Sequence, residues 1–253
     1  MLISFEPIDH LTGFERQGLT NLEPNTVHLC GIELDGSPRC LERCAQWLDE
    51  EEHHRAARLV REMDRQRYVL AHGGLRAVLA RYTGLDPSAL TFQLGLTGKP
   101  ALLHGRVPQH PLGFNLSHSH GRMLMAISNK QDVGVDLEQI CDKVEAAKLA
   151  DRFYAPAERD RVINLSGPGQ TQQFYRYWVA KEAVLKGQAV GLRSLQQCEI
   201  HTSDDSPRAE VKLSEGVAMQ PGWMVHWLDC EAGWVGAVSA HGSDWAICIK
   251  TRA

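Results

Sequence analysis

The stretch at residues 174–192, FYRYWVAKEAVLKGQAVGL, constrains the fold of this chain most strongly. Four of its side chains recur at steps of four, which places them on one face of a helix: Phe174, Trp178, Glu182 and Lys186. The two aromatic rings predict that this face packs into a core and carries a carboxylate and an amine one turn apart. An ordinary amphipathic helix with a surface ion pair, worth about 0.2–0.5 kcal/mol, has the same pattern. The stretch by itself therefore leaves both interpretations open.

The composition is that of a globular protein. The chain has 253 residues, of which 43% are hydrophobic and 23% are charged, so one large domain or two smaller domains can form a core. The net charge of −4 gives no overall signal for nucleic-acid binding. We expect no membrane segment, because no apolar run approaches the roughly 20 residues that span a bilayer, and the first ten residues lack the basic region of a signal peptide.

The cysteines indicate a reducing compartment. There are seven, an odd number, and Cys40 and Cys44 are the only close pair. No second pair completes a set of zinc ligands. We therefore expect free thiols and a cytoplasmic protein.

Two carboxylates alternate along the segment GVDLE at residues 134–138. In a strand, Asp136 and Glu138 share one face, while Val135 and Leu137 occupy the other. Carboxylates about 7 Å apart along a strand repel each other unless a cation lies between them. Magnesium fits, because it binds one or two carboxylates together with phosphate oxygens. The exposed polar face of an edge strand explains the same alternation.

A row of arginines follows an acidic run at residues 49–52, which suits the first turn of a second helix after the one that begins at residue 40. The row comprises Arg55, Arg58, Arg61, Arg65 and Arg67. It is either a solvated helix face or an anion-binding face, since arginine pairs bidentately with phosphate.

His118 and His120 lie in a strand that runs into a polar turn. They suggest a metal pair, but no third ligand is near them in the sequence. A hydrogen-bonded turn histidine, or one that binds phosphate, is the alternative.

Each half of the chain carries helices and several strands, which predicts the α+β class, with subdomains at residues 1–130 and 131–253. We expect helices at residues 40–56, 68–82 and 146–153 and a loop at 165–170 before the long helix. We expect strands at residues 26–34, 91–94, 114–120, 123–128, 133–138, 198–201, 209–213, 223–228, 234–240 and 245–250.

Six segments together resemble the Sfp-type 4′-phosphopantetheinyl transferase family, in its order and approximate spacing. They are GKP at 98–100, FNLSHS at 114–119, GVDLE at 134–138, RFYAPAE at 152–158, WVAKEAVLK at 178–186, and Gly191-Leu192. Each segment alone is weak, but GVDLE followed about 40 residues later by W-x-x-K-E-x-x-x-K is specific. One departure is Ala189, where the family often has glycine.

The resemblance implies two similar α+β subdomains related by pseudo-twofold symmetry, with coenzyme A in the cleft between them. It implies magnesium-dependent transfer of 4′-phosphopantetheine from coenzyme A to a serine of an apo acyl or peptidyl carrier protein, which releases 3′,5′-ADP. The length favours a monomer whose halves replace the subunits of a dimer. The sequence does not select the carrier among fatty-acid, polyketide, peptide-synthetase and lysine-biosynthesis systems.

The resemblance also implies roles for particular residues. Asp136, Glu138 and Glu182 would hold the metal against the pyrophosphate. Lys186 would contact the phosphate under attack, and Glu182 would help to deprotonate the serine, so Asp136, Glu182 and Lys186 form the expected catalytic set. The coenzyme A site would be lined by Arg67, Gly98, Lys99, Pro100, Ser117, His118 and Lys186, with Arg55 and Arg58 near the 3′-phosphate.

Two other functions compete with the transferase. An inactive homologue would bind coenzyme A or a carrier without turnover. A magnesium-dependent phosphohydrolase would cleave a nucleotide without a carrier.

Overall fold

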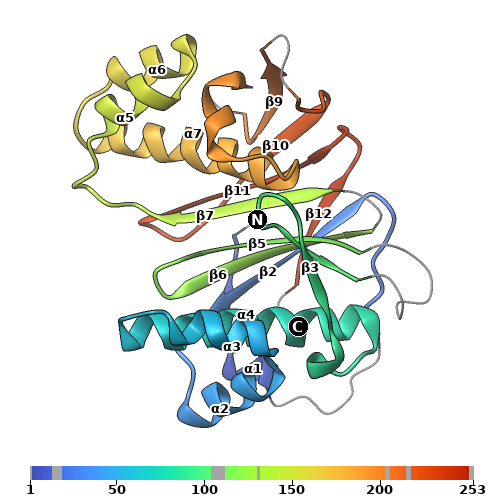
Figure 1. Cartoon of the computed structure of the whole chain (residues 1–253). Helices are drawn as coiled ribbons and strands as arrows, with labels where there is room; N and C mark the ends of the chain where they lie inside the picture. The colour runs from blue at the N-terminus through green and yellow to red at the C-terminus, as the bar shows by residue number, and fades with distance from the viewer. Residues whose placement is uncertain are drawn as a thin grey trace.

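The computed structural model describes residues 2–12, 19–103, 112–129, 132–202, 206–214 and 218–250. Two five-stranded sheets lie against each other between two groups of helices (Figure 1). The α+β class expected from the sequence is confirmed. The layered order follows from burial, because each sheet has one apolar face toward the other sheet and one toward helices.

The first sheet contains strands from both ends of the chain. Its order is β1 (Phe5–Pro7), β2 (Thr26–Glu33), β6 (Arg122–Asn129) and β5 (Leu112–Ser119), and β12 (Ala246–Ile249) also pairs with β2. The pairings of β1 and β12 with β2 are parallel, and those of β6 are antiparallel. The last strand of the chain therefore lies in the same sheet as its first strand.

The helices on the first sheet are α1 (Asp9–Thr12), α2 (Pro38–Trp47), α3 (Glu50–Ala57) and α4 (Glu62–Thr83), followed by the short η1 (Pro87–Ala89). The prediction that the helix from residue 40 continues to about residue 56 is wrong, because it ends at Trp47. A second helix does begin at the acidic run of residues 49–52, as predicted, and its N-cap is Asp49. Its side chain accepts from Glu52 N at 2.9 Å, while the Glu52 carboxylate accepts from Asp49 N at 3.0 Å. The predicted end of α4 at Gly84 is confirmed, and its φ of 70° is one that glycine adopts easily.

The second sheet is antiparallel in the order β7 (Val133–Gln139), β11 (Trp234–His241), β10 (Trp223–Leu228), β9 (Arg208–Leu213) and β8 (Cys198–His201). Its helices are α5 (Ala146–Phe153), α6 (Pro156–Ile163), α7 (Gly167–Gly187) and η2 (Leu192–Gln197). The predicted loop at residues 165–170 is partly wrong. Pro168 occupies the first turn of α7, where a missing N–H costs nothing. None of the described helices has the length and apolarity needed to cross a bilayer.

Period-two alternation decides which face of each strand is buried in which layer. Val135 and Leu137 of β7 pack between the sheets, so Asp136 faces the opposite way, as the alternation predicted. In β2, Leu29 packs between the sheets and Cys30 packs toward α4. All seven cysteines, each of which the structure describes, are free thiols, as expected.

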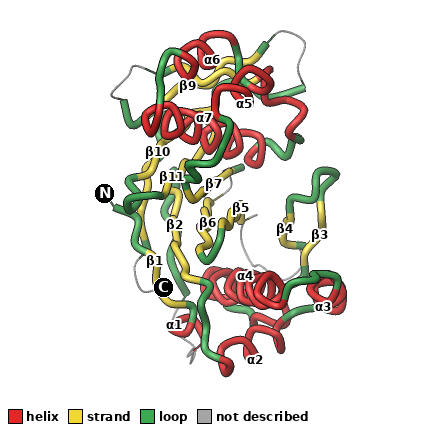
Figure 2. The backbone as a smooth tube through the Cα atoms, turned by 90° about the vertical axis from the view of Figure 1, so that its left-hand side faces the viewer, coloured by secondary structure: helices red, strands yellow, loops and turns green. Residues whose placement is uncertain are grey.

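A small hairpin stands apart from both large sheets (Figure 2). It consists of β3 (Phe92–Leu94) and β4 (Pro100–Leu102), which pair antiparallel. Its base is held by Phe92, whose ring lies 5.0 Å from the Arg76 guanidinium and 5.9 Å from the Phe114 ring. The hairpin turn carries the GKP segment.

Candidate active site

Helix α7 lies directly on strand β7, and glycine permits this approach. A Cβ on Gly134 would lie 1.9 Å from Ala183 O and 2.4 Å from Gly187 N. Any larger residue at this position would push the helix away from the strand. The contact brings Glu182 and Lys186, in the last turns of α7, to the face of β7 that carries Asp136.

Asp136 is the most deeply buried charged group of the site, with a relative exposure of 1%. Its Oδ1 accepts from Ser117 Oγ at 2.7 Å and from Lys186 Nζ at 2.6 Å. Its Oδ2 is also buried and has no hydrogen-bond partner within the part of the chain that the structure describes. A buried carboxylate oxygen without a donor is costly, which makes it a ready ligand for a cation.

Strands β5 and β7 are edge strands of different sheets, and side chains join them. Asn115 Oδ1 accepts from Val135 N at 2.9 Å. Two residues further along β5, Ser117 donates to Asp136 of β7, as described above. Ser119 Oγ donates to Glu138 Oε2 at 2.8 Å. Asn115 and Ser119 were not among the site residues predicted from the sequence, although their alternation within FNLSHS indicates a polar face of the strand.

The carboxylates of the site affect one another. Burial, followed by the charge of Asp136, raises the pKa of Glu182 to about 7 and also raises the pKa of Glu138. Lys186 opposes both shifts. Nevertheless, among the described residues no three metal-ligating side chains are gathered tightly enough to hold an ion as they stand. The donors do fit magnesium chemically, since all are hard carboxylate oxygens and Asp136 Oδ2 is unpartnered.

A cavity of about 290 Å³ joins segments from both halves of the chain. The GKP turn, β5 and the end of α7 all contribute to its wall. Its lining includes Gly98, Lys99, Pro100, Asn115, Glu182 and Lys186. The structure thus brings the expected GKP segment beside two members of the expected catalytic set. His118 is exposed by surface area, but the surrounding protein desolvates its ring, and this effect, followed by the charge of Lys186, lowers its pKa.

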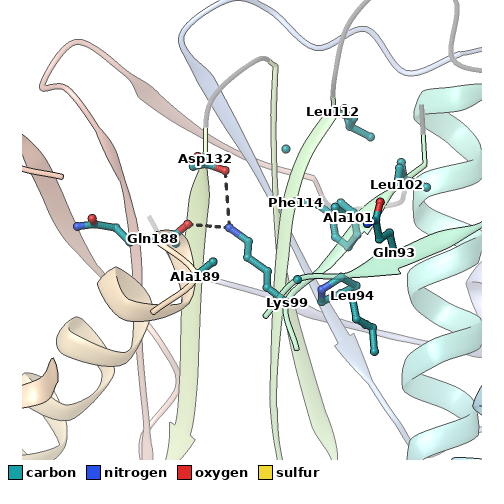
Figure 3. Close-up of a pocket in the computed structure, with 14 residues that line it drawn as sticks. Gln93, Leu94, Lys99, Ala101, Leu102, Leu112, Phe114, Asp132, Gln188 and Ala189 are labelled. Carbon is teal, nitrogen blue, oxygen red and sulfur yellow. Dashed lines mark hydrogen bonds and ion pairs between the residues drawn. The ribbon is translucent and has the colours of Figure 1, made fainter. Parts of the chain in front are cut away.

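Lys99 lines this cavity but directs its amine elsewhere. Its Nζ donates to Gly187 O at 2.8 Å and lies 3.9 Å from an Asp132 carboxylate oxygen (Figure 3). It also donates to Val133 O at 3.2 Å. Burial lowers the pKa of Lys99, and the charge of Asp132 opposes this. Figure 3 also shows side chains that line a second cavity, between the β3–β4 hairpin and the end of α7. Its volume is about 470 Å³.

The expected arginines are dispersed. Arg55 lines another cavity of about 470 Å³, between α3, α4 and the hairpin, and pairs with Glu51 at 2.8 Å. Tyr68 and His72 line the same cavity. Arg58 is exposed just beyond the end of α3. Arg67, in α4, extends its guanidinium to the turn between β5 and β6, where its Nη2 lies 3.4 Å from the position of a Cβ on Gly121.

The lysine before Glu182 has a different environment. Lys181 is fully buried, and its Nζ lies 2.6 Å from Glu158 Oε2. Glu158 also accepts from Ala155 N at 2.9 Å and from Ile200 N at 2.7 Å. This pair ties the RFYAPAE segment to the WVAKEAVLK helix inside the second half, so its role is structural.

Two α+β halves, with carboxylates and a lysine gathered where they meet, define a class of enzyme suited to phosphoryl-group chemistry. Residues 35–131 match the 4′-phosphopantetheinyl transferase N-terminal family, and residues 132–237 match the 4′-phosphopantetheinyl transferase superfamily. The chain is 33% identical over 219 residues to the 4′-phosphopantetheinyl transferase HetI of Nostoc sp., covering 87% of this chain and 89% of the relative.

Two further relatives agree. The chain is 30% identical over 152 residues to the 4′-phosphopantetheinyl transferase Sfp of Bacillus subtilis, which covers 60% of this chain and 64% of that protein. It is 34% identical over 92 residues to the 4′-phosphopantetheinyl transferase AcpT of Escherichia coli, covering 36% and 45%. The chain therefore belongs to the 4′-phosphopantetheinyl transferase family, whose members use coenzyme A and act on carrier proteins. This confirms the resemblance and favours the transferase over an inactive homologue.

Proposed function

We propose that this chain transfers 4′-phosphopantetheine from coenzyme A to a serine of an apo acyl or peptidyl carrier protein, with its reaction centre at Asp136, Glu182 and Lys186. The observation that carries this assignment is the buried Asp136 carboxylate, which binds Lys186 Nζ at 2.6 Å and keeps its second oxygen unpartnered among the described residues. Phosphoryl transfer depends on positioning and on charge stabilisation, which such a centre can provide.

Magnesium would be held by Asp136, Glu138 and Glu182. The support is chemical. There are three hard oxygen donors and an unpartnered Oδ2 on Asp136, and burial together with the charge of Asp136 raises the pKa values of the other two carboxylates. When bound, the ion supplies neutralisation of the charge on the pyrophosphate. Ser119 donates a hydrogen bond of 2.8 Å to Glu138 and would hold this carboxylate in place for the ion.

Lys186 would contact the phosphate under attack. Its side chain has a relative exposure of 32% and lines the cavity of about 290 Å³. Bonds to Asp136 Oδ1 at 2.6 Å and Ser117 Oγ at 2.9 Å fix the ammonium, so little reorganisation is needed when a phosphate enters. Glu182, with its pKa raised to about 7, would accept the proton of the carrier serine near neutral pH.

The coenzyme A contacts would come mainly from the first half. Gly98, with φ of 83° and no neighbour within 4 Å of a hypothetical Cβ, leaves room for the ligand near the backbone. Arg55 faces a cavity and would meet the 3′-phosphate, with Arg58 near the end of the same helix. The other residues proposed to line the coenzyme A site are Arg67, Lys99, Pro100, Ser117 and His118.

The proposal extends to the oligomeric state, the cellular compartment and the class of carrier. The enzyme would act as a monomer, with subdomains at residues 1–130 and 131–253 taking the place of two subunits. Joining of β5 and β7 by side chains within one chain supports this. Free thiols accord with the cytoplasm. The carrier would belong to fatty-acid, polyketide or nonribosomal peptide synthesis.

A panel of apo carriers incubated with magnesium and fluorescent coenzyme A tests the proposal. We expect at least one carrier to gain the label on its serine, and Glu182→Ala to remove labelling while folding normally. The matched control is Glu210→Gln, an exposed carboxylate on β9. If the whole panel stays unlabelled by wild-type protein, or if Glu182→Ala labels at the wild-type rate, the assignment is wrong.

A further inference from the structure

The β3–β4 hairpin needs an attachment at its turn end. It is a separate two-stranded sheet, and such a hairpin is marginally stable alone. Phe92 anchors its base, as described above, but the GKP turn lies at the far end (Figure 2). Gly95 N donates to Lys99 O at 2.9 Å, which closes the turn locally without fixing its position on the protein.

Lys99 provides a link from this turn to the other half of the chain. Its ammonium has three donors and reaches the carbonyls of Gly187 at 2.8 Å and Val133 at 3.2 Å. An Asp132 carboxylate oxygen lies 3.9 Å away, and Figure 3 shows this carboxylate and the Gly187 carbonyl beside the amine. The side chain has a relative exposure of 15%. An amine committed to these acceptors is not free to meet a phosphate in the cavity.

The acceptors lie at a rigid point of the second half. Gly187 ends α7, where carbonyls lack helical partners and carry partial negative charge that attracts a cation. A Cβ on Gly187 would lie 2.4 Å from the Trp223 ring. Gly134 also packs against Gly187. Gly187 directly follows Lys186, and Val133 begins the strand that carries Asp136.

We propose that Lys99 is a positioning residue that fixes the GKP turn at a set distance from the reaction centre, by bonding to the carbonyls of Gly187 and Val133. The inference rests on the proposed function, because it assigns the turn to the coenzyme A site. Gly98 and Pro100 share one cavity with Glu182 and Lys186, so a ligand that touches both walls needs their spacing fixed beforehand. Lys99 therefore acts through the backbone of its neighbours, without contacting the phosphates.

The test compares Lys99→Met with Lys99→Arg, and with Lys212→Met, an exposed lysine on β9. Amide hydrogen exchange across residues 92–102 is measured without ligand. We expect Lys99→Met to speed this exchange by about 10- to 100-fold, the range for losing a hydrogen bond to a charged group. Lys99→Arg should recover most of the protection, and Lys212→Met should match wild type.

Steady-state transfer provides a second readout. With Lys99→Met we expect the KM for coenzyme A to rise at least about tenfold, while kcat falls by less than about threefold, because the bound state can still restore the spacing. The rise in KM should be equal for dephospho-coenzyme A, which lacks only the 3′-phosphate, since Lys99 makes no contact with that group. Unchanged hairpin exchange, or a KM effect that disappears with dephospho-coenzyme A, would overturn the proposal in favour of a phosphate contact. Failure of wild type to label carriers would refute the proposed function, whereas the exchange experiment would still decide the role of Lys99.

Discussion

Lys186 Nζ and Asp136 Oδ1 lie 2.6 Å apart, although 50 positions separate the two residues in the chain. Asp136 is almost fully buried and Lys186 is partly exposed. The lysine thus compensates the buried carboxylate in the free protein while remaining accessible to a ligand. A cation that binds the unpartnered oxygen of Asp136 would share this carboxylate with the lysine.

The Asp136 carboxylate should be essential for transfer. We expect Asp136→Asn to lower the rate of carrier labelling at least about 100-fold, because it removes both a proposed metal ligand and the partner of Lys186. The amide is nearly isosteric, so circular dichroism and thermal unfolding should show a folded protein. A variant that labels at more than a tenth of the wild-type rate would place the metal elsewhere.

Glu182 should make stability depend on pH. Burial and the charge of Asp136 raise its pKa from 4.5 to about 7, so the folded state resists ionisation. The unfolded chain ionises first, and stability falls as pH rises between 4.5 and about 7. We therefore expect Glu182→Gln to raise the free energy of unfolding by about 1–3 kcal/mol at pH 8, and hardly at all at pH 4.5. Denaturant unfolding at both pH values measures this, and a destabilised variant at pH 8 would contradict the shift.

Magnesium should stabilise the free protein without coenzyme A. Binding at about 100 times the dissociation constant adds about 2.7 kcal/mol to the free energy of unfolding. The gain should be larger at pH 8 than at pH 6, because ions bind the ionised form of Glu182. Thermal unfolding with magnesium and after chelation checks this. Asp136→Asn and Glu182→Gln should lose the gain, while Glu210→Gln should keep it; equal gains in all four proteins would exclude this site.

Ala189 is under backbone strain that glycine would relieve. Its φ is 53°, in the left-handed region, at the position where the family often has glycine. Ala189→Gly should stabilise the protein by about 1 kcal/mol, because the left-handed conformation costs a non-glycine residue about 1–2 kcal/mol and glycine adds some unfolded-state entropy. Ala157→Gly, at an exposed position inside α6, should instead destabilise by about 0.5–1 kcal/mol. Denaturant unfolding of both variants gives the comparison, and the same sign for both would contradict it.

The buried Lys181–Glu158 pair should matter for folding. Lys181→Met leaves an uncompensated buried carboxylate, so we expect a loss of about 3–5 kcal/mol in the free energy of unfolding. The double variant Lys181→Met/Glu158→Gln should recover much of this loss, because the glutamine carries no charge. Denaturant unfolding measures both. A loss in the double variant equal to that in the single one would show that shape, and not charge, dominates here.

Local patterns in the sequence predicted much of the second half of the site. The four-residue steps from Phe174 to Lys186 predicted a helix with an aromatic base, and the structure has Phe174 stacked on Trp178 at 5.8 Å. The alternation in GVDLE predicted that Asp136 faces away from the apolar side of β7. Both are properties of a single helix or strand, whose period is fixed by backbone geometry. The acidic run at residues 49–52 also predicted the start of α3, although the preceding helix was predicted to continue past it.

The sequence by itself therefore determined the class of fold, the main elements and the types of side chain available for chemistry, because these depend on residues a few positions apart. The tertiary structure alone decided the contacts between distant segments. It joined β12 to β2, set Ser119 against Glu138, and directed Lys99 to a carbonyl 88 positions away. Such contacts depend on the close packing of whole elements, such as α7 on β7 at Gly134, and packing leaves no periodic signal in the sequence.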